Sequence, residues 1–465
     1  MNMSRTYQMM AFSALAIGAF AALTACALED AAYPKAHVDM ADAKAVAAFY
    51  RDTMERLADF ALVPPKYIQH PGGGYGCKYV VTNLDYCMCG TVTVTKKGRI
   101  WAGWFSGGDD PRGFFCAARS DDGGRTWSGP EFVIDPHDSS LPVPRFTLCA
   151  DLWVDPKGRL HLFHDQTMGG YYRSERYFLN QCTTSDSRRG VWHAVCEDPD
   201  AETLVWSKPE RIADGNCLNK PFIAKDGTWF LPIARGIHAG HPFNVAFNET
   251  CEKVKGAWLM ASTDEGRTWS FRGGVRFPES TWFEHMAYEM WDGRLRMFSR
   301  SLNKEHGIYE AYSSDGGRTW TDPVPAAAAG IDAPCSRFHV KRLKSGNILF
   351  VKHGDTMSDR NRLSRSNLRA FLSKDDGRTW LGGLLLEPAE CSYPDVYEAD
   401  DGALHIVYDH ARDRAAELRY ARITEKDILA GKLVDPKSVL KVRAFKAFRN
   451  HMKQYAKERE SSCVR

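Results

Sequence analysis

One octapeptide occurs four times in this chain: SDDGGRTW at 120–127, STDEGRTW at 262–269, SSDGGRTW at 313–320 and SKDDGRTW at 373–380. All four copies fit the pattern S-x-D-x-G-x-T-W, and chance does not explain such agreement in 465 residues. The pattern is typical of a hairpin turn, because the Asp oxygens can accept backbone N–H groups, the Gly permits a positive φ and the Trp packs beneath the turn. We therefore expect one β-hairpin unit to be repeated along the chain.

A second repeated element gives the number of units. A small turn ending in Gly, followed by a β-like run, occurs six times: KKGRIWAGW, PKGRLHLFH, KDGTWFLPI, WDGRLRMFS, KSGNILFVK and DDGALHIVY. The glycines stand at positions 98, 158, 227, 293, 346 and 402, and their intervals of 60, 69, 66, 53 and 56 residues suit four short strands plus loops. The sequence thus predicts an all-β fold, a six-bladed β-propeller with short flanking helices.

Composition and charge exclude several function classes. The chain is 44% hydrophobic and 26% charged, as expected of a globular protein with a sizeable core. Its net charge is only +3, and residues 436–465 alone hold nine Lys/Arg against two Glu, so the rest carries 3 − 7 = −4. This balance argues against a nucleic-acid partner, which would require a strongly basic face.

The first residues, MNMSRTYQMMAFSALAIGAFAALTAC, are typical of an export signal. Arg5 is followed by no further charge until Glu29, and the apolar stretch between them is too short for a confident membrane span. The segment Leu23-Thr24-Ala25-Cys26 resembles the bacterial lipobox, in which cleavage before the Cys is followed by its acylation. We expect a lipoprotein anchored to the membrane through Cys26, at the cell surface or in the periplasm, and a plain secretory signal is the alternative.

The predicted organisation has four parts. Helical spacing of apolar residues before and after the repeats predicts flanking helices. The parts are a lipoprotein signal peptide (1–25), a helical lead-in (26–74), the propeller (75–425) and a basic helical tail (426–465). After Cys26 twelve cysteines remain, none in a zinc-like pattern, so we expect buried thiols with a few disulfides and neither a metal nor another cofactor.

The octapeptide is the Asp box, and residues 75–425 as a whole resemble the sialidase (neuraminidase) superfamily, in particular its bacterial branch with BNR repeats. In that family the boxes lie at the blade periphery and are structural, so they support the fold far more than the function. The resemblance implies a retaining exo-α-sialidase that removes terminal sialic acid, or a related acidic sugar, from extracellular glycans.

Two segments carry the resemblance into the site. In FEHMAYEMWDGRLRMFSR (283–300), Glu284 falls on the family's Glu and Arg300 on its second substrate-binding Arg. In RLSRSNLRAFLSKDDGRTW (362–380), Arg365 stands at the family's interval before the Asp box, which matches its third Arg. The family likeness implies that both arginines bind the substrate carboxylate, ideally in a bidentate manner.

The segment CSYPDVYEADDG (391–402) resembles the stretch that holds the family's nucleophilic Tyr, here Tyr393. Sialic acid has a carboxylate on its anomeric carbon, so an ionised Asp or Glu would approach against like charge. A neutral tyrosine avoids this repulsion, and Glu284 can take its proton. Sialidases are accordingly an exception to the two-carboxylate rule of glycosidases.

The acid/base and the first arginine are less sharply defined. In FSGGDDPRG (105–113), Asp109 or Asp110 is the candidate acid that protonates the leaving oxygen. The family's first Arg precedes a TVT-x-x-G strand, but here CMCGTVTVTKKG places Met88 at that position. Three arginines near strand ends could substitute, with Arg145 favoured: Arg112, Arg145 and Arg235.

Two other functions remain open. Met88 and three histidines that could enter the pocket, His238, His285 and His353, allow a glycosidase or lyase that acts on uronic-acid polysaccharide, although structural histidines are the commoner case. A carbohydrate-binding lipoprotein without catalysis is the other alternative, and it is favoured if Tyr393 and Glu284 lie too far apart to share a hydrogen bond.

Overall fold

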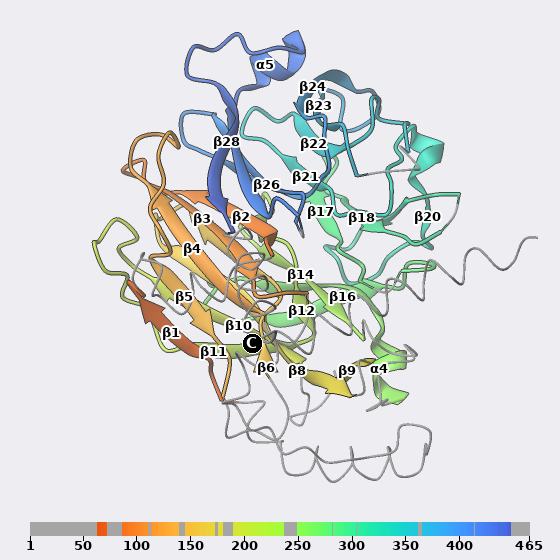
Figure 1. The fold of residues 1–465 in the computed structure, drawn as a ribbon. Coiled ribbons are helices and arrows are strands. Elements are labelled where there is room, and N and C mark those ends of the chain that lie inside the picture. The colour runs from red at the N-terminus through yellow and green to blue at the C-terminus, as the bar shows by residue number, and fades with distance from the viewer. Residues whose placement is uncertain are drawn as a thin grey trace, which may run out of the picture.

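Six β-sheets are arranged around one axis, as Figure 1 shows in ribbon form. The computed structural model describes residues 63–71, 86–109, 113–138, 145–172, 175–179, 189–236, 249–280, 282–303, 305–360, 365–412 and 414–447. Each sheet is antiparallel and is one blade, so the prediction of a six-bladed all-β propeller is confirmed.

The blades follow one another in chain order. Blade one consists of β1 (Lys66–Gln69), β2 (Met88–Val94), β3 (Ile100–Ser106), β4 (Phe114–Ser120) and β5 (Phe132–Asp135). Blade two consists of β6 (Arg145–Phe146), β7 (Ala150–Val154), β8 (Leu160–Tyr172), β9 (Glu175–Leu179), β10 (Arg189–Cys196) and β11 (Glu210–Asp214). Blade three consists of β12 (Asn216–Cys217), β13 (Phe222–Ile223), β14 (Trp229–Arg235), β15 (Gly256–Ser262) and β16 (Ser270–Val275). Blade four consists of β17 (Met286–Glu289), β18 (Leu295–Arg300), β19 (Ile308–Ser313) and β20 (Val324–Pro325). Blade five consists of β21 (His339–Arg342), β22 (Ile348–His353), β23 (Leu368–Ser373) and β24 (Leu381–Glu387). Blade six consists of β25 (Cys391–Glu398), β26 (Leu404–His410), β27 (Glu417–Ile423) and β28 (Val439–Lys446).

With the strands of each blade counted outward from the axis, the six predicted turn glycines connect the first strand to the second: β2 to β3, β7 to β8, β13 to β14, β17 to β18, β21 to β22 and β25 to β26. All six have a positive φ, between 78° and 93°, which explains why Gly occupies each of these turns: Gly98, Gly158, Gly227, Gly293, Gly346 and Gly402. These turns lie at one end of the propeller, so the starts of the first strands and the ends of the second strands lie at the other end. That other end is called the mouth below.

The four octapeptides lie between the third and fourth strands of blades one, three, four and five. In the first of them Asp122 Oδ1 accepts the backbone N–H groups of Arg125 and Thr126, and Asp122 Oδ2 accepts the Thr126 hydroxyl at 2.6 Å. Gly124 has a φ of 88°, and a Cβ there would lie 2.2 Å from the Tyr420 ring. The octapeptides therefore form self-contained turns on the side away from the mouth, as expected of structural elements.

The hydrophobic core is divided among the interfaces between blades. Among the described residues, each adjacent pair of blades encloses its own apolar cluster, including the pair of blades six and one. The first strands also contact each other around the axis: β2 contacts β7 and β25, and β21 contacts β17 and β25. Burial of this apolar surface closes the ring and holds the strand ends at the mouth in fixed positions.

Two predicted boundaries are wrong. Residues 66–69, assigned to the helical lead-in, form β1, which pairs with β5 at the outer edge of blade one. Residues 439–446, assigned to the helical tail, form β28, the outer strand of blade six. In VLKVRAFK the apolar residues also fit strand alternation, and pairing with β27 satisfies its backbone. Residues 26–62 of the lead-in, which include Cys26, its residues 72–74 and the tail beyond 447 lie outside the described residues.

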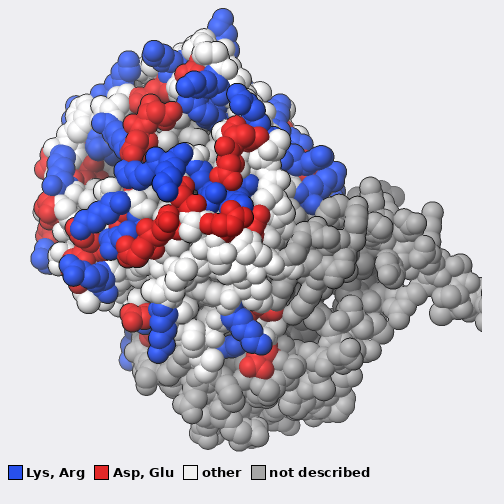
Figure 2. Space-filling view, turned by 90° about the vertical axis from the view of Figure 1, so that its left-hand side faces the viewer, with Lys and Arg blue, Asp and Glu red and all other residues white. Residues whose placement is uncertain are grey.

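Helices are few in the described segments. They are α4 (Glu249–Val254), α5 (Glu425–Ala430) and the 3₁₀ helix η1 (Ala326–Ala329). None of these helices is both long and apolar enough to cross a bilayer. On the face shown in Figure 2, basic and acidic side chains are interspersed, in keeping with the small net charge.

Candidate active site

Three of the predicted site residues meet at the mouth. Tyr393 lies near the start of β25, Glu284 lies two residues before β17, and Arg300 ends β18. Tyr393 Oη donates a hydrogen bond of 2.6 Å to Glu284 Oε1. Arg300 Nη1 donates to the same carboxylate oxygen at 2.6 Å and to Tyr393 Oη at 3.1 Å. Three residues that lie 16, 93 and 109 positions apart in the sequence thus form one hydrogen-bonded triad.

The backbone at this triad is strained. Tyr393 has a φ of 53° and Glu284 a φ of 39°, and residues other than Gly rarely adopt such values. The register of β25 also shifts between Ser392 and Asp395, so a bulge re-aims the Tyr393 side chain. Backbone strain of this kind clusters at functional sites, where the surrounding structure maintains it.

Four guanidinium groups surround Tyr393. Arg300 contacts its oxygen, and the guanidinium carbons of Arg412, Arg337 and Arg365 lie 4.6, 5.4 and 5.6 Å from the centre of its ring. Arg365 is one of the predicted residues, and its Nη2 donates to the Cys335 carbonyl at 3.0 Å. The candidate nucleophile therefore lies in a strongly electropositive environment.

Arg337 has a structural role beneath the site. It is buried, and its guanidinium donates to backbone carbonyls from three blades, including those of Leu218 at 2.6 Å and Gly90 at 3.3 Å. It also donates to the Tyr393 carbonyl at 3.4 Å. Arg337 thus ties the strained backbone at Tyr393 to blades one and three.

Burial and nearby charges determine which of Tyr393 and Glu284 carries the proton. Burial raises the pKa of Tyr393 well above its usual value, and the neighbouring Glu284 charge adds to this, while Arg300 opposes it. Burial alone would raise the pKa of Glu284, but the charge and hydrogen bond of Arg300 and the Tyr393 hydroxyl hold it below its usual value. At neutral pH the proton is therefore on the tyrosine, and the glutamate is an ionised base that can accept it.

Arg412 is a further residue beside Tyr393 that no sequence motif indicated. It follows β26, and its Nη1 lies 2.8 Å from the sulfur of Met88, the residue at the position of the expected first arginine. Its Nη2 donates to Asp409 Oδ2 at 3.1 Å. The sequence holds one local signal for this residue, because Asp409 and Arg412 lie three residues apart at the mouth end of β26 and can form an ion pair. The contact between Arg412 and Met88, however, joins residues 324 positions apart.

The predicted acid lies on the same side of the molecule. Asp109 follows β3 at the mouth and is close enough to Tyr86 and Arg189 for its charge to influence both side chains. Asp110 and Arg112 lie outside the described residues.

Arg145 and Arg235 have other described neighbours. Arg145 donates to the carbonyls of Pro136 at 3.0 Å and Val63 at 2.9 Å. Arg235 packs over the rings of Trp258 and Phe271. The substitution of either for the first arginine stays a prediction.

Two of the three histidines that could enter the pocket, His285 and His353, have structural contacts. His285 Nε2 lies 2.8 Å from the Trp258 carbonyl, and burial lowers its pKa to about 4. His353 Nδ1 lies 3.3 Å from the Ser366 carbonyl, and burial together with Arg365 lowers its pKa to about 3. Both are thus neutral at physiological pH, and His238 lies outside the described residues.

Metal ligands and disulfides are not part of this site as far as the structure describes the chain. Within the described ranges, no group of three or more His, Cys, Asp or Glu side chains could hold a metal ion. The described cysteines are thiols rather than disulfides: Cys87, Cys89, Cys116, Cys149, Cys196, Cys217, Cys335 and Cys391. The disulfides expected from the sequence therefore do not occur among these residues.

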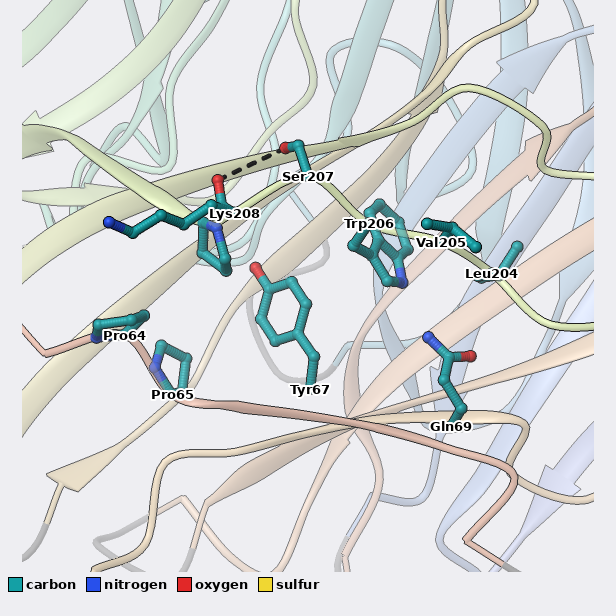
Figure 3. A pocket seen from close by; sticks show the side chains of 10 residues that line it. Pro64, Pro65, Tyr67, Gln69, Leu204, Val205, Trp206, Ser207 and Lys208 are labelled. Atoms are coloured by element: carbon teal, nitrogen blue, oxygen red, sulfur yellow. Dashed lines mark hydrogen bonds between the residues drawn. The ribbon is translucent and has the colours of Figure 1, made fainter.

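A separate pocket of about 460 Å³ lies at the outer edge of blades one and two (Figure 3). Tyr67 of β1 projects between its own strand and the segment from Leu204 to Pro209. Tyr67 Oη lies 2.9 Å from His164 Nε2, and its ring packs edge-on against Trp206. None of the candidate catalytic residues lines this pocket, so it is distinct from the mouth.

Sequence comparison relates the chain to a family and to a curated protein. The family model of the BNR repeat-like domain matches residues 98–406. A sialidase from Micromonospora viridifaciens is 26% identical over 343 residues, which are 68% of this chain and 49% of that protein. The chain thus spans about half the length of the curated relative that it matches.

Solved sialidase structures share the fold. The intramolecular trans-sialidase from Ruminococcus gnavus is 14% identical, with a TM-score of 0.53 over 78% of this chain and 98% of that chain. The NanB sialidase from Streptococcus pneumoniae is 14% identical, with a TM-score of 0.54 over 79% of this chain and 71% of that chain. At these identities the likeness shows the propeller architecture alone.

Proposed function

Because this chain belongs to the family of BNR repeat-like domain proteins, within the sialidase superfamily, we propose that it is a retaining glycoside hydrolase of sialidase type. Its proposed substrate is a glycan outside the cell that ends in sialic acid or a related acidic sugar. The observation that carries the proposal is the 2.6 Å hydrogen bond from Tyr393 to Glu284, with Arg300 donating to both residues.

In the first proposed step, Tyr393 Oη attacks the anomeric carbon while the glycosidic C–O bond breaks. Glu284 accepts the phenol proton through the hydrogen bond that already joins the two groups. The carboxyl group of Asp109 or Asp110 gives its proton to the leaving oxygen. The products of this step are the free aglycone and a sugar bound covalently to Tyr393.

In the second proposed step, the carboxylate left on Asp109 or Asp110 takes a proton from a water molecule, which attacks the anomeric carbon. The bond from that carbon to Tyr393 Oη breaks, and Glu284 returns the proton to the phenol oxygen. Two successive displacements at one carbon leave the anomeric configuration unchanged, so the enzyme is a retaining one.

Charge explains how the site would hold an acidic sugar. Glu284 balances Arg300, but no carboxylate pairs with Arg365 among the described residues, where Arg365 donates a hydrogen bond to the Cys335 carbonyl. A substrate carboxylate supplies the missing negative charge, and a guanidinium can bind it through two parallel hydrogen bonds. Arg300 and Arg365 thus favour an anionic sugar over a neutral one.

The Tyr393–Glu284 separation also supports catalysis over a binding-only function. A non-catalytic lectin has no need for a tyrosine and a glutamate in a strained, hydrogen-bonded pair, whereas proton transfer requires contact at about 2.6 to 3.2 Å.

The activity is tested with the purified protein and a fluorogenic α-sialoside, with proton NMR following the first-formed anomer. We expect release of free sialic acid as the α-anomer. A parallel incubation with uronic-acid polysaccharide should give no unsaturated product absorbing in the near ultraviolet. Absence of sialoside cleavage together with such an absorbing product would instead support the lyase alternative.

We further propose that the protein is exported and anchored through an acylated Cys26. Cells expressing the full chain should incorporate labelled palmitate into it, because the residues before Cys26 resemble a lipobox. Cys26→Ser should abolish the label and release the protein from the membrane fraction. Equal labelling of the wild-type and Cys26→Ser proteins would exclude this anchor.

A further inference from the structure

We infer that Arg412, contributed by the loop between β26 and β27, binds the substrate carboxylate together with Arg365 and Arg300, with Tyr86 as an additional donor. This inference rests on the proposed function, because it assigns the residue that recognises the acidic group of that substrate. On this inference Arg412, rather than Arg145, completes the set of arginines.

The backbone brings Arg412 across a blade boundary. The preceding Ala411 has a φ of 46°, and its N–H donates to the Glu390 carbonyl at 3.1 Å, so the chain turns sharply after β26. The Arg412 carbonyl then accepts the N–H of Cys87 at 3.1 Å. This bond ties the last blade to the start of β2 and places the Arg412 side chain beside Met88.

Two donors at this place have no strong acceptor among the residues that the structure describes. Arg412 Nη1 lies 2.8 Å from Met88 Sδ, and Tyr86 Oη lies 3.2 Å from the same sulfur. A thioether sulfur is only a weak hydrogen-bond acceptor. Donors that converge on a weak acceptor remain available for a stronger one, and a carboxylate oxygen is the strongest that this substrate carries.

The other side of Arg412 is held firmly. Its Nη2 donates to Asp409 Oδ2 and contacts the Ser392 hydroxyl, which itself donates to Asp409 Oδ1 at 2.6 Å. The Arg412 side chain is 18% exposed, whereas Asp409 is 1% exposed. Asp409 and Ser392 therefore hold Nη2 of the guanidinium, while Nη1 lies beside Met88.

The position relative to Tyr393 completes the argument. The Arg412 guanidinium lies 4.6 Å from the centre of the Tyr393 ring, closer than that of Arg365 at 5.6 Å. A sugar whose anomeric carbon is at Tyr393 Oη has its carboxylate on that same carbon. Guanidinium groups around the phenol are thus within reach of the carboxylate, and the first-arginine position is filled from a different blade.

The test measures binding of 2,3-unsaturated sialic acid and of its methyl ester to the full chain by titration calorimetry. Arg412→Ala should weaken binding of the acid by roughly 10- to 100-fold, the usual effect of losing one charge-assisted hydrogen-bonding pair. Binding of the ester should change by less than about threefold, because the ester has no charge for Arg412 to pair with. Arg414→Ala, at an exposed site two residues away, is the matched control and should behave as wild type.

Arg412→Ala also removes the partner of the buried Asp409, so a second pair of variants keeps the test independent of folding. Arg412→Lys retains a positive charge for Asp409 but not the planar fork, and it should weaken binding of the acid by an intermediate amount. The double variant Met88→Arg/Arg412→Met moves the guanidinium to the neighbouring position. It should recover at least about tenfold of the affinity for the acid that is lost in Arg412→Met alone.

The outcomes separate the two claims. A wild-type protein that cleaves sialosides and binds the acid, with Arg412→Ala and Arg412→Lys binding the acid equally well, overturns the role of Arg412 and leaves the proposed function intact. Equal losses for acid and ester would also overturn it, because they indicate a general structural effect. A wild-type protein that neither cleaves sialosides nor binds the acid overturns the proposed function and this inference with it.

Discussion

Tyr393→Phe is expected to lower kcat/KM on an aryl sialoside by at least about 10³-fold. The substitution removes only the phenol oxygen, which the proposed mechanism uses as the nucleophile and which now donates to Glu284 at 2.6 Å. The aromatic ring would stay among the guanidinium groups of Arg337, Arg365 and Arg412, so the fold and the binding of sialic acid should be retained. Steady-state kinetics and calorimetry on the same preparation measure both quantities.

The matched control for this variant is Tyr397→Phe. Tyr397 is also in β25, but its hydroxyl donates to the Val154 carbonyl at 3.3 Å, away from Glu284. Its loss should leave kcat/KM within about threefold of wild type. Comparable activities of the Tyr393→Phe and wild-type proteins would rule out Tyr393 as the nucleophile.

Glu284→Gln is expected to lower kcat by about 10²- to 10⁴-fold, the usual contribution of a positioned general base. An amide cannot take the proton of Tyr393, and it leaves Arg300 without its carboxylate partner. KM should change much less than kcat, because Glu284 acts on the nucleophile and does not hold the sugar. Glu289→Gln, on β17 and bonded to the Lys225 N–H, is the matched control.

The pH dependence of this step has a definite sign. Arg300 and the Tyr393 hydroxyl hold the pKa of Glu284 below its ordinary value of 4.5, so the base is ionised above that pH. The acid limb of kcat/KM due to this residue should therefore lie below pH 4.5. Because the folded pKa is lowered, the stability that ionised Glu284 contributes is present above pH 4.5 and is lost as pH falls through the folded pKa. An acid limb in wild type that is centred well above pH 4.5 and is lost in Glu284→Gln would contradict this assignment.

The features predictable from sequence are those with local physical causes. The six turn glycines and four octapeptides each need a positive φ or a side-chain cap within a few residues, so their spacing revealed the number of blades. Tyr393, Glu284, Arg300 and Arg365 were found because the family likeness carries their spacing. The structure brings these four residues together.

The features missed are those that depend on distant partners. Nothing near Met88 indicates that Arg412 reaches it, because that contact exists only after blade six closes against blade one. The strand β28 was mistaken for a helix because its apolar residues fit both periodicities, and only pairing with β27 decides between them. The strand β1 was also missed, because only its pairing with the distant β5, which supplies its hydrogen bonds, identifies it as a strand.

Covalent trapping tests the central claim most directly. A fluorinated sialosyl fluoride forms the first intermediate readily, and its fluorine substituent slows the hydrolysis that follows. Mass spectrometry of the inactivated protein should then show one fluorosialosyl group, attached to the peptide that contains Tyr393. The Tyr393→Phe protein should carry none. Attachment at a carboxylate such as Glu284, or inactivation of Tyr393→Phe at the wild-type rate, would contradict the assignment of Tyr393 as the nucleophile.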